Sequence, residues 1–256
     1  MSKWALVTGA TAGIGESFTH LLAKEGFNIV LVARDLERMK ERAAYLQSQY
    51  KVETAIVQAD LATDGGCARV EKYIRENHVE VLINNAGFGI NKAFSVSNLD
   101  SEEQLLAVLV RTPMRLMHTV LPQMKERNSG SIINVSSVAG WIAGGTYSAS
   151  KSYLTVLSES IHTEMNGTGV KISALCPGFT RTEFHERGRM RMNGLPKFMW
   201  LSSDRVVSQG WKENQNGKVL SVPGWQYLIL STISRFGPRP LVRKLGMNVR
   251  KRQRQK

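Results

Sequence analysis

Short β-branched or apolar runs alternate with helical patterns along most of this chain, and no other feature of the sequence limits the fold as strongly. The runs expected to form strands are residues 5–7, 29–33, 54–58, 79–83, 131–135, 172–175 and 219–222. The stretches expected to form helices are residues 14–25, 36–50, 65–77, 101–127 and 147–166. Strands that alternate with helices predict a parallel sheet wound by helices on both faces, and right-handed crossovers leave few topologies. We therefore expect a doubly wound α/β fold with a parallel sheet of about seven strands.

A chain of 256 residues, of which 42% are apolar, suits one large α/β domain over residues 1–256 better than two small ones. No apolar run reaches the ~18 residues that a bilayer-spanning helix needs. The two cysteines, Cys67 and Cys176, lie far apart and outside any metal-ligand or redox spacing. Without a secretion signal, this cysteine usage predicts a cytoplasmic protein with reduced thiols and no metal site.

A glycine-rich turn follows the first strand and opens the first helix. Residues 8–15 read Thr-Gly-Ala-Thr-Ala-Gly-Ile-Gly. Glycines let a backbone approach a pyrophosphate, and a helix N-terminus supplies free N–H groups and a positive dipole. The spacing is Gly-x-x-x-Gly-x-Gly, so this is a variant of the usual nucleotide turn. The alternative is a tight strand–helix turn with no ligand.

The end of the second strand indicates which dinucleotide would bind. An acidic side chain at this strand tip would accept a hydrogen bond from a ribose 2′-hydroxyl. Here Ala33 occupies that place and Arg34 follows, which suits a 2′-phosphate and favours NADP(H) over NAD(H). Two alternatives stay open: Arg34 is a solvated loop charge, and Asp35 caps the next helix.

Polar residues also follow the other expected strands. Asp60 ends the third strand, Asn84 to Gly87 end the fourth, Ser136 and Ser137 the fifth, and residues 176–182 the sixth. Any one of these could be ordinary turn chemistry. Ligands of open α/β sheets bind at the carboxyl ends of the strands, so these ends together predict one binding edge.

Tyr147 and Lys151 stand four residues apart just inside the start of an expected helix. Residues at this spacing share a helix face, so the ammonium group can lie near the phenol. A phenol normally titrates near pH ~10, and a nearby positive charge favours the phenolate. Tyr147 is therefore a candidate proton donor and acceptor. A surface pair with no function is the alternative.

Together these residues resemble the short-chain dehydrogenase/reductase family over about residues 3–182. The matching motifs are the turn at residues 8–15, the Asn-Asn-Ala-Gly motif at 84–87, Ser137, the Tyr-x-x-x-Lys pair and the Pro-Gly segment at 177–178. Residues 174–185 look like actinobacterial members of unassigned substrate. The resemblance implies a single-domain Rossmann fold that carries out NAD(P)-dependent carbonyl reduction or alcohol oxidation. The residues expected to touch the cofactor are Gly9, Thr11, Gly13, Ile14, Gly15, Arg34, Asp60, Leu61, Asn85, Ala86, Gly87, Tyr147, Lys151, Pro177, Gly178, Thr180 and Thr182.

The resemblance also implies roles for a catalytic set of Ser137, Tyr147 and Lys151. Ser137 would hydrogen-bond the substrate oxygen, and Tyr147 would donate or accept the proton. Lys151 would lower the pKa of the phenol and hold the nicotinamide ribose. The cofactor itself supplies the hydride chemistry.

Two departures from the family pattern affect this prediction. Leu109 occupies the place of an asparagine that commonly supports a proton relay, which puts proton delivery in doubt. Ser137 and Tyr147 are ten residues apart, where about thirteen are common. The shorter loop predicts an altered substrate mouth.

The C-terminal third should set substrate choice. Residues 183–201 mix Met and aromatic residues with Arg, and we expect an apolar lid there or, alternatively, a plain surface excursion. His185 is the one histidine expected to touch substrate. The apolar residues Trp225, Ile229, Ile233 and Phe236 recur at helical spacing, which indicates core packing or subunit contact rather than membrane contact.

Net charge is +13, and nine Lys or Arg with no acidic residue lie between Arg235 and Lys256. We expect residues 237–256 to form a solvated basic tail that binds anionic membranes weakly and no specific nucleic acid. The leading function is an NADP-dependent oxidoreductase of an apolar ketone, aldehyde or secondary alcohol, as a homodimer or homotetramer. The alternatives are an NADP(H) sensor without turnover, motivated by Leu109, and a basic docking scaffold.

Overall fold

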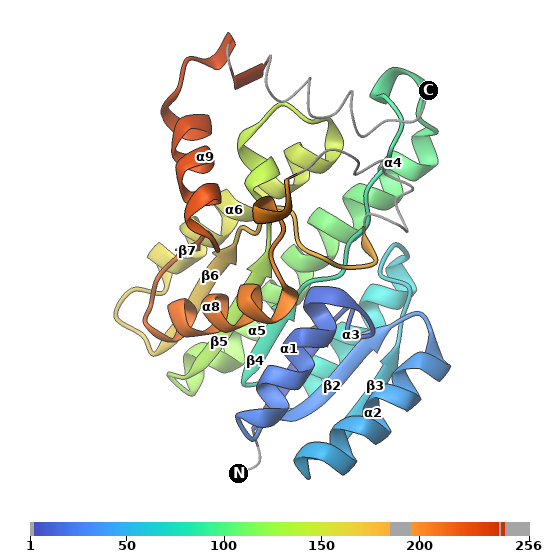
Figure 1. The fold of residues 1–256 in the computed structure, drawn as a ribbon. Helices are drawn as coiled ribbons and strands as arrows, with labels where there is room; N and C mark the ends of the chain where they lie inside the picture. The colour runs from blue at the N-terminus through green and yellow to red at the C-terminus, as the bar shows by residue number, and fades with distance from the viewer. Residues whose placement is uncertain (1–2, 185–195, 241, 244–256) are drawn as a thin grey trace.

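The computed structural model describes residues 3–184, 196–240, 242 and 243. Its strands form one parallel sheet in the order β3-β2-β1-β4-β5-β6-β7 (Figure 1). The strands are β1 (Trp4–Thr8), β2 (Asn28–Ala33), β3 (Thr54–Gln58), β4 (Val81–Asn84), β5 (Gly130–Val135), β6 (Val170–Leu175) and β7 (Leu220–Ser221). The predicted seven-stranded, doubly wound Rossmann fold is therefore confirmed.

Helices cover both faces of the sheet. They are α1 (Gly13–Lys24), α2 (Leu36–Tyr50), α3 (Asp64–Glu76), α4 (Leu99–Leu106), α5 (Thr112–Glu126), α6 (Thr146–Glu164), α8 (Ser203–Gln215) and α9 (Trp225–Phe236). Short helical turns are η1 (Phe94–Val96), η3 (Val138–Trp141) and η4 (Lys197–Met199). Helices α1, α2 and α8 pack on one face, and α3, α5 and α6 pack on the other. The order in which strands are added to the sheet reverses between β1 and β4, and ligands of such sheets bind at the carboxyl ends of the strands at this point.

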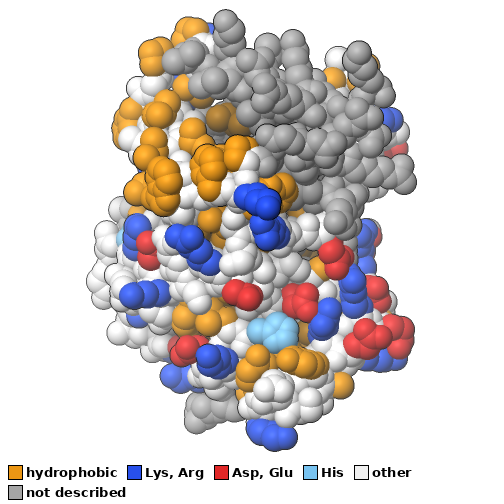
Figure 2. Space-filling model, viewed as in Figure 1, with side chains coloured by type: hydrophobic (Ala, Val, Ile, Leu, Met, Phe, Trp, Pro, Cys, Tyr) orange, Lys and Arg blue, Asp and Glu red, His pale blue; other side chains and the backbone are white. Residues whose placement is uncertain are grey.

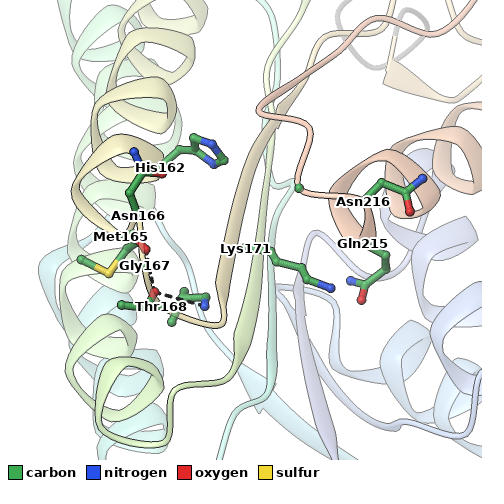
Figure 3. Close-up of a pocket in the computed structure, with 10 residues that line it drawn as sticks. His162, Met165, Asn166, Gly167, Thr168, Lys171, Gln215 and Asn216 are labelled. Atoms are coloured by element: carbon green, nitrogen blue, oxygen red, sulfur yellow. Dashed lines mark hydrogen bonds between the residues drawn. The ribbon is translucent and has the colours of Figure 1, made fainter.

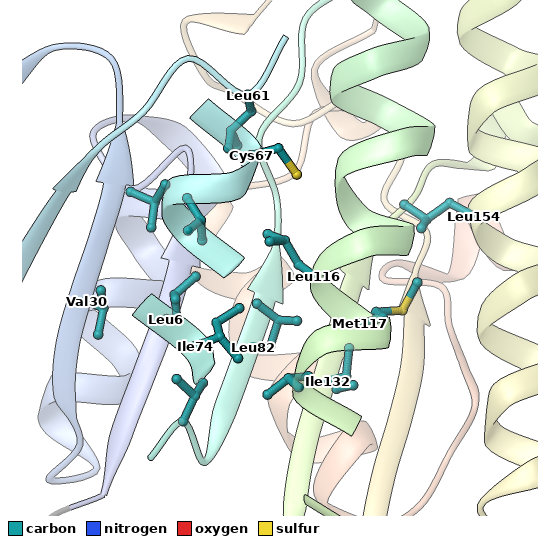
Figure 4. Close-up of a cluster of buried hydrophobic side chains, with 14 of the residues drawn as sticks. Leu6, Val30, Leu61, Cys67, Ile74, Leu82, Leu116, Met117, Ile132 and Leu154 are labelled. Carbon is teal, nitrogen blue, oxygen red and sulfur yellow. The ribbon is translucent and has the colours of Figure 1, made fainter. Parts of the chain in front are cut away.

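The central strands are apolar because helices bury them from both sides. Leu6, Leu82 and Ile132 of β1, β4 and β5 are fully buried on one face of the sheet. They meet Leu116 of α5 and Ile74 of α3 in a continuous cluster (Figure 4). A second cluster on the other face is built from α1, α2 and α8. These two layers hold the strand ends in fixed register at the predicted binding edge.

The helix expected at residues 101–127 has a wider turn in its middle. A π-helical turn, η2 (Ala107–Arg111), joins α4 to α5. Pro113 follows it in the first turn of α5. A proline ring conflicts with the carbonyl four residues earlier, here that of Leu109, and a π turn relieves such a conflict. Helix α8 had no sequence prediction because its buried positions include Gly210 and Asn214, which weaken its apolar pattern.

Core packing, one of the two uses expected for the apolar stripe at residues 225–236, is wrong. Trp225–Phe236 is helical, but Trp225, Ile229, Ile233 and Phe236 are exposed rather than packed in the core. The buried side of α9 carries Tyr227 and the polar Gln226 and Ser231 instead. Most of the lid predicted at 183–201, including His185, and most of the tail at 237–256 lie outside the described residues. Within the described part, no helix combines the length and the apolar character needed to cross a bilayer.

Candidate active site

The glycine-rich turn links β1 to α1, and its geometry requires glycine. Gly9 has φ = +65°, a region that glycine enters most easily. A Cβ at Gly15 would lie 2.2 Å from the Gly9 carbonyl oxygen. Thr11 is buried beside them, while Gly13 and Ile14 begin α1. Helix α1 therefore starts at the carboxyl end of β1 with two glycines in its first three positions, which lets neighbouring groups approach its backbone closely.

The end of β4 is tied to this turn by hydrogen bonds around Thr8. The Thr8 hydroxyl accepts from the backbone N–H groups of Asn85, at 2.9 Å, and Ala86, at 3.1 Å. The Asn85 side-chain amide donates to the carbonyls of Thr8, at 2.9 Å, and Gly9, at 3.2 Å. The structure thus places Asn85, Ala86 and Gly87 beside the glycine-rich turn.

Ser137, Tyr147 and Lys151 lie where η3 packs against the start of α6. Ser137 caps η3, and its hydroxyl accepts from Ala139 N at 3.1 Å and donates to Pro177 O at 3.4 Å. The Lys151 Nζ lies 5.7 Å from the centre of the Tyr147 ring. Lys151 is only 4% exposed, so the alternative of a solvated surface pair is excluded.

Burial sets the electrostatics of the lysine. The Lys151 amine donates to the Val135 carbonyl at 2.6 Å, and burial lowers its pKa to about 8. Ser136 and Thr155 donate to the Lys151 carbonyl at 2.8 and 2.9 Å, which fixes α6 against β5. Burial also raises the pKa of the neighbouring Cys176 to about 11, so this thiol stays neutral. Below pH ~8, Lys151 is therefore the charged group of the site.

The segment after β6 is held by a tyrosine from α9. A Cβ at Gly178 would lie 2.0 Å from the Tyr227 ring, so this glycine allows the ring to pack directly on the segment. The Tyr227 hydroxyl accepts from Phe179 N at 2.9 Å and donates to the Met199 carbonyl. Burial raises the pKa of Tyr227 to about 12, so it stays a neutral donor. Tyr227 thereby fixes the loop that contains the predicted nicotinamide-lining residues.

The far end of this segment reaches the glycine-rich turn. A Cβ at Gly13 would lie 2.9 Å from the Thr182 side chain, so these two residues are in contact range. Thr182 Oγ1 accepts from Phe184 N at 3.3 Å, and the buried Thr180 donates to Gly178 O at 3.1 Å. The structure therefore brings the predicted residues at 177–182 onto the same edge as the turn.

The predicted adenosine end lies beyond β2 and β3. The Arg34 side chain is exposed, and its carbonyl accepts from Gln58 Nε2 at 2.9 Å. Asp35 caps α2 by accepting from Arg38 N at 3.0 Å, as the alternative prediction for Asp35 proposed. Asp60 lies two residues after the end of β3, and its carboxylate accepts a hydrogen bond from Ala62 N at 3.0 Å. Its neighbour Leu61 is buried in the core, which leaves Asp60 as the more accessible of the two.

Two residues near the site, Tyr227 and Arg38, had no sequence prediction, and Thr8 was expected only as the first residue of the glycine-rich turn. Arg38 forms a two-bond ion pair with Glu183, at 3.1 Å for each bond. It lies in the first turn of α2, four residues after Arg34 in the sequence. Tyr227 carried no local signal, because its contact with Gly178 spans 49 residues of chain.

Leu109 is an apolar part of the site wall. It is 1% exposed within the core, and a Cβ at Gly87 would lie 2.8 Å from Leu109 Cδ2. Gly87 thus packs directly against the Leu109 side chain. A buried position in such contact offers no polar atom, so Leu109 takes no part in moving a proton.

The surface hollow and the side-chain groupings described next lie away from the predicted binding edge or do not form a second site. A surface hollow of about 380 Å³ is lined by His162, Lys171 and Gln215, among others, at the opposite, amino end of β6 (Figure 3). It contains none of the predicted site residues. Among the residues that the structure describes, no three His, Cys, Asp or Glu side chains group as metal ligands would.

Comparison with known proteins agrees with this geometry. Residues 3–192 match the family described as short chain dehydrogenase. A bovine very-long-chain 3-oxoacyl-CoA reductase is 30% identical over 91% of this chain and 80% of its own length. A short-chain dehydrogenase from Sphingobium yanoikuyae in complex with NADPH has a TM-score of 0.83 at 29% identity, covering 90% of this chain and 92% of that one. A bulky-bulky ketone specific alcohol dehydrogenase from Comamonas testosteroni has a TM-score of 0.79 at 30% identity, with the same coverage. This chain therefore belongs to the short-chain dehydrogenase/reductase family of oxidoreductases.

Proposed function

We propose that this protein is an NADP-dependent oxidoreductase that reduces an apolar ketone or aldehyde, or oxidises the corresponding secondary alcohol. The observation that carries the proposal is the placement of the buried Lys151 amine 5.7 Å from the Tyr147 ring, where η3, which Ser137 caps, packs against α6. A charge buried at this position costs folding free energy, which a purely structural pair would not require.

The three side chains divide the work of handling one substrate oxygen. Ser137 binds that oxygen through its hydroxyl, which now donates weakly to Pro177 O at 3.4 Å. Tyr147 gives its phenolic proton to the oxygen during reduction and takes it back during oxidation. Lys151 stabilises the phenolate by its charge and holds the nicotinamide ribose. When bound, the dinucleotide supplies the hydride.

The residues at the binding edge fit a dinucleotide. The N-terminus of α1, with Gly13 and Gly15 in its first turn, suits a pyrophosphate. Residues 177–182 suit the nicotinamide, with Thr182 beside Gly13. Asp60 and Leu61 suit the adenine, and Asn85 to Gly87 lie between the two ends.

Arg34 supports the choice of NADP(H). Its exposed side chain follows a strand tip without an acidic residue. Arg34→Asp is expected to weaken NADPH binding at least about tenfold while changing NADH binding little, because only the former carries the 2′-phosphate. Fluorescence titration with both cofactors measures this. Equal losses for the two cofactors would refute the assignment.

An apolar substrate is supported by the rings beside the site. Phe184 lies 5.8 Å from the Tyr147 ring, and Phe179 lies 6.0 Å from Trp200. Phe184 and Trp200 belong to the predicted lid at 183–201, and Phe179 lies just before it in the sequence. The names of the related proteins, which describe a very-long-chain 3-oxoacyl-CoA and a bulky-bulky ketone, point to the same substrate class.

The test is NADPH oxidation by the purified protein with bulky aliphatic ketones, aldehydes and long-chain 3-oxoacyl thioesters. Tyr147→Phe should lose turnover by at least about a hundredfold, since it removes the general acid. Tyr153→Phe on the same helix is the matched control and should keep full turnover. Turnover that survives in Tyr147→Phe would contradict the assigned proton donor.

A second candidate function is an NADP(H) sensor without turnover, because Leu109 removes the side chain that commonly relays the proton. Tight NADPH binding with no turnover on the whole panel would favour it. A nucleotide sensor would need the glycine-rich turn, Arg34 and Asp60, but it would have no use for a proton donor at Tyr147 with the Ser137 hydroxyl beside it.

We also propose a cytoplasmic homodimer or homotetramer. Exposed apolar residues on α4, α5 and α6, namely Leu106, Met114, Tyr153 and Val156, offer a surface for pairing. Cys67 and Cys176 are unpaired and buried, as suits a reducing compartment. The basic tail at 237–256 would add weak, salt-sensitive attraction to anionic membranes and no specific binding of nucleic acid.

A further inference from the structure

Helix α9 is held against the body of the protein by one side only. Tyr227 packs on Gly178, and Gln226 donates to the carbonyl of Phe198 at 3.0 Å. Ser231 is buried on the same side. These contacts fix the rotation of the helix, so the direction in which its remaining side chains point is set by the fold.

The outer side of α9 is a broad apolar surface. Its apolar side chains are between 44% and 80% exposed, and hydrophobic atoms gather over this helix in Figure 2. The residues of this outer face are Trp225, Leu228, Ile229, Leu230, Ile233 and Phe236. Contiguous exposed apolar surface of this kind marks an interaction site, because leaving it in water is unfavourable.

The charge carried by α9 itself, and by the sequence after it, has one sign, and the nearest ion pair joins Arg235 to Glu159 of α6 at 3.9 Å. Helix α9 contains no acidic residue, and none follows it in the sequence. Arg235, Arg239 and Arg243 stand at its C-terminal end. The Arg235 guanidinium lies 5.5 Å from the centre of the Trp141 ring, which holds this cation at the edge of the apolar surface. An apolar face with a basic rim complements a layer of acyl chains beneath anionic headgroups.

A second copy of the chain fits this face less well. Two copies meeting through the same face would offer the arginine rim no acidic partner from the other α9, because this helix contains no acidic residue. Tryptophan and arginine beside aliphatic residues are instead typical of helices that lie in a membrane interface. We propose that the outer face of α9 docks this enzyme on an anionic phospholipid bilayer.

Docking through α9 would bring the active site next to the membrane. Helix α9 packs against η3, the turn capped by Ser137, and its Tyr227 holds the 177–179 loop. An apolar substrate could then enter from the bilayer without crossing water. This consequence rests on the proposed function, whereas the docking itself does not.

The test is flotation of the full-length protein with phosphatidylcholine vesicles and with vesicles that also contain phosphatidylglycerol. Wild type should float with the anionic vesicles and remain behind with the neutral ones. Ile229→Glu should reduce the bound fraction at least about tenfold, because it places a charge in the apolar contact. The matched control is Tyr45→Glu on α2, since Tyr45 is 47% exposed and Ile229 is 52% exposed.

A second variant probes the rim. Arg239→Glu combined with Arg243→Glu should abolish flotation with anionic vesicles, and NADPH binding should be unchanged in every variant as the check of folding. Absence of wild-type flotation, or equal losses in Ile229→Glu and Tyr45→Glu, would overturn the proposal. So would sedimentation velocity in which Ile229→Glu separates subunits while vesicle binding persists, because the face would then belong to a second copy. Flotation requires no turnover, so failure of docking and failure of the proposed reaction are separate results.

Discussion

The buried amine of Lys151 makes folding stability depend on pH in a way that one substitution isolates. Burial lowers the pKa of Lys151 to about 8 in the folded protein, whereas an unfolded lysine titrates near pH ~10.4. Between these values the unfolded chain binds one proton more than the folded chain, so stability rises with pH. The cost of the charge is therefore complete below pH ~8 and disappears as the pH approaches ~10.4.

The size of this effect follows from the gap between the two pKa values. One pKa unit corresponds to ~1.4 kcal/mol, so the charge costs roughly 3 kcal/mol of unfolding free energy at low pH. Between pH ~6.5 and ~9.5, wild type should gain roughly 2 kcal/mol relative to Lys151→Met, which has no titrating group at this position. The lost bond to the Val135 carbonyl shifts the variant by an amount that does not depend on pH, so the slope carries the information.

Urea unfolding followed by far-UV circular dichroism at several pH values across this range measures the slope. Lys72→Met is the control, because the Lys72 side chain is 71% exposed and its substitution should leave the pH dependence of wild type unchanged. If wild type and Lys151→Met show parallel stability curves, the Lys151 amine is not desolvated in the folded state and the reasoning fails. A converging pair of curves would also give the pH above which the site loses its positive charge.

Three further substitutions test the walls of the site. Tyr227→Phe should cost ~1–3 kcal/mol of stability, because it removes the hydrogen bonds from Phe179 N and to the Met199 carbonyl, and an unchanged urea midpoint would show that Tyr227 does not hold the 177–179 loop. Leu109→Asn should lower the unfolding free energy by a similar ~1–3 kcal/mol, because it buries an amide in the core. A urea midpoint equal to that of wild type would show that the position tolerates a polar group. Gly15→Ala should lower NADPH affinity at least about tenfold, since its Cβ would lie 2.2 Å from the Gly9 carbonyl oxygen, and calorimetry would reveal unaltered binding if the turn can relax.

The fold could be predicted because local and long-range signals agree. Apolar runs marked the strands to within about two residues, and buried parallel strands need helices on both faces. The π turn at Ala107–Arg111 could not be predicted from local patterns. It relieves a steric conflict between the Pro113 ring and the Leu109 carbonyl, and this conflict arises only when the helix continues through both residues. Helix α8 was missed for the opposite reason. Its buried face contains the polar Asn214, whose side-chain amide donates to Ser173 Oγ at 2.9 Å. A buried asparagine does not fit an apolar pattern, so the sequence did not indicate this helix.

The site could be predicted where its residues share one short motif and could not where distant segments meet. Gly9, Gly15 and Lys151 are each required by a local turn or by a helix spacing. Tyr227 and Arg38 contribute through contacts with Gly178 and Glu183, which are far away in the chain. The roles of the predicted residues, and the likeness of residues 174–185 to actinobacterial members, stay predictions.

Helix α9 shows why periodicity alone could not assign its apolar face. The spacing of Trp225, Ile229 and Ile233 indicated that one face is apolar, and core packing or subunit contact was the expected use of it. The opposite face is buried instead, because Tyr227 fills the space over Gly178 and its hydroxyl hydrogen-bonds two backbone groups. An isoleucine at that position could not form these hydrogen bonds. A helix with one specific polar anchor can therefore turn its larger apolar face to the outside. The exposed apolar face would be stabilised by a partner that removes it from water. An anionic bilayer would bury its apolar residues and attract its arginine rim.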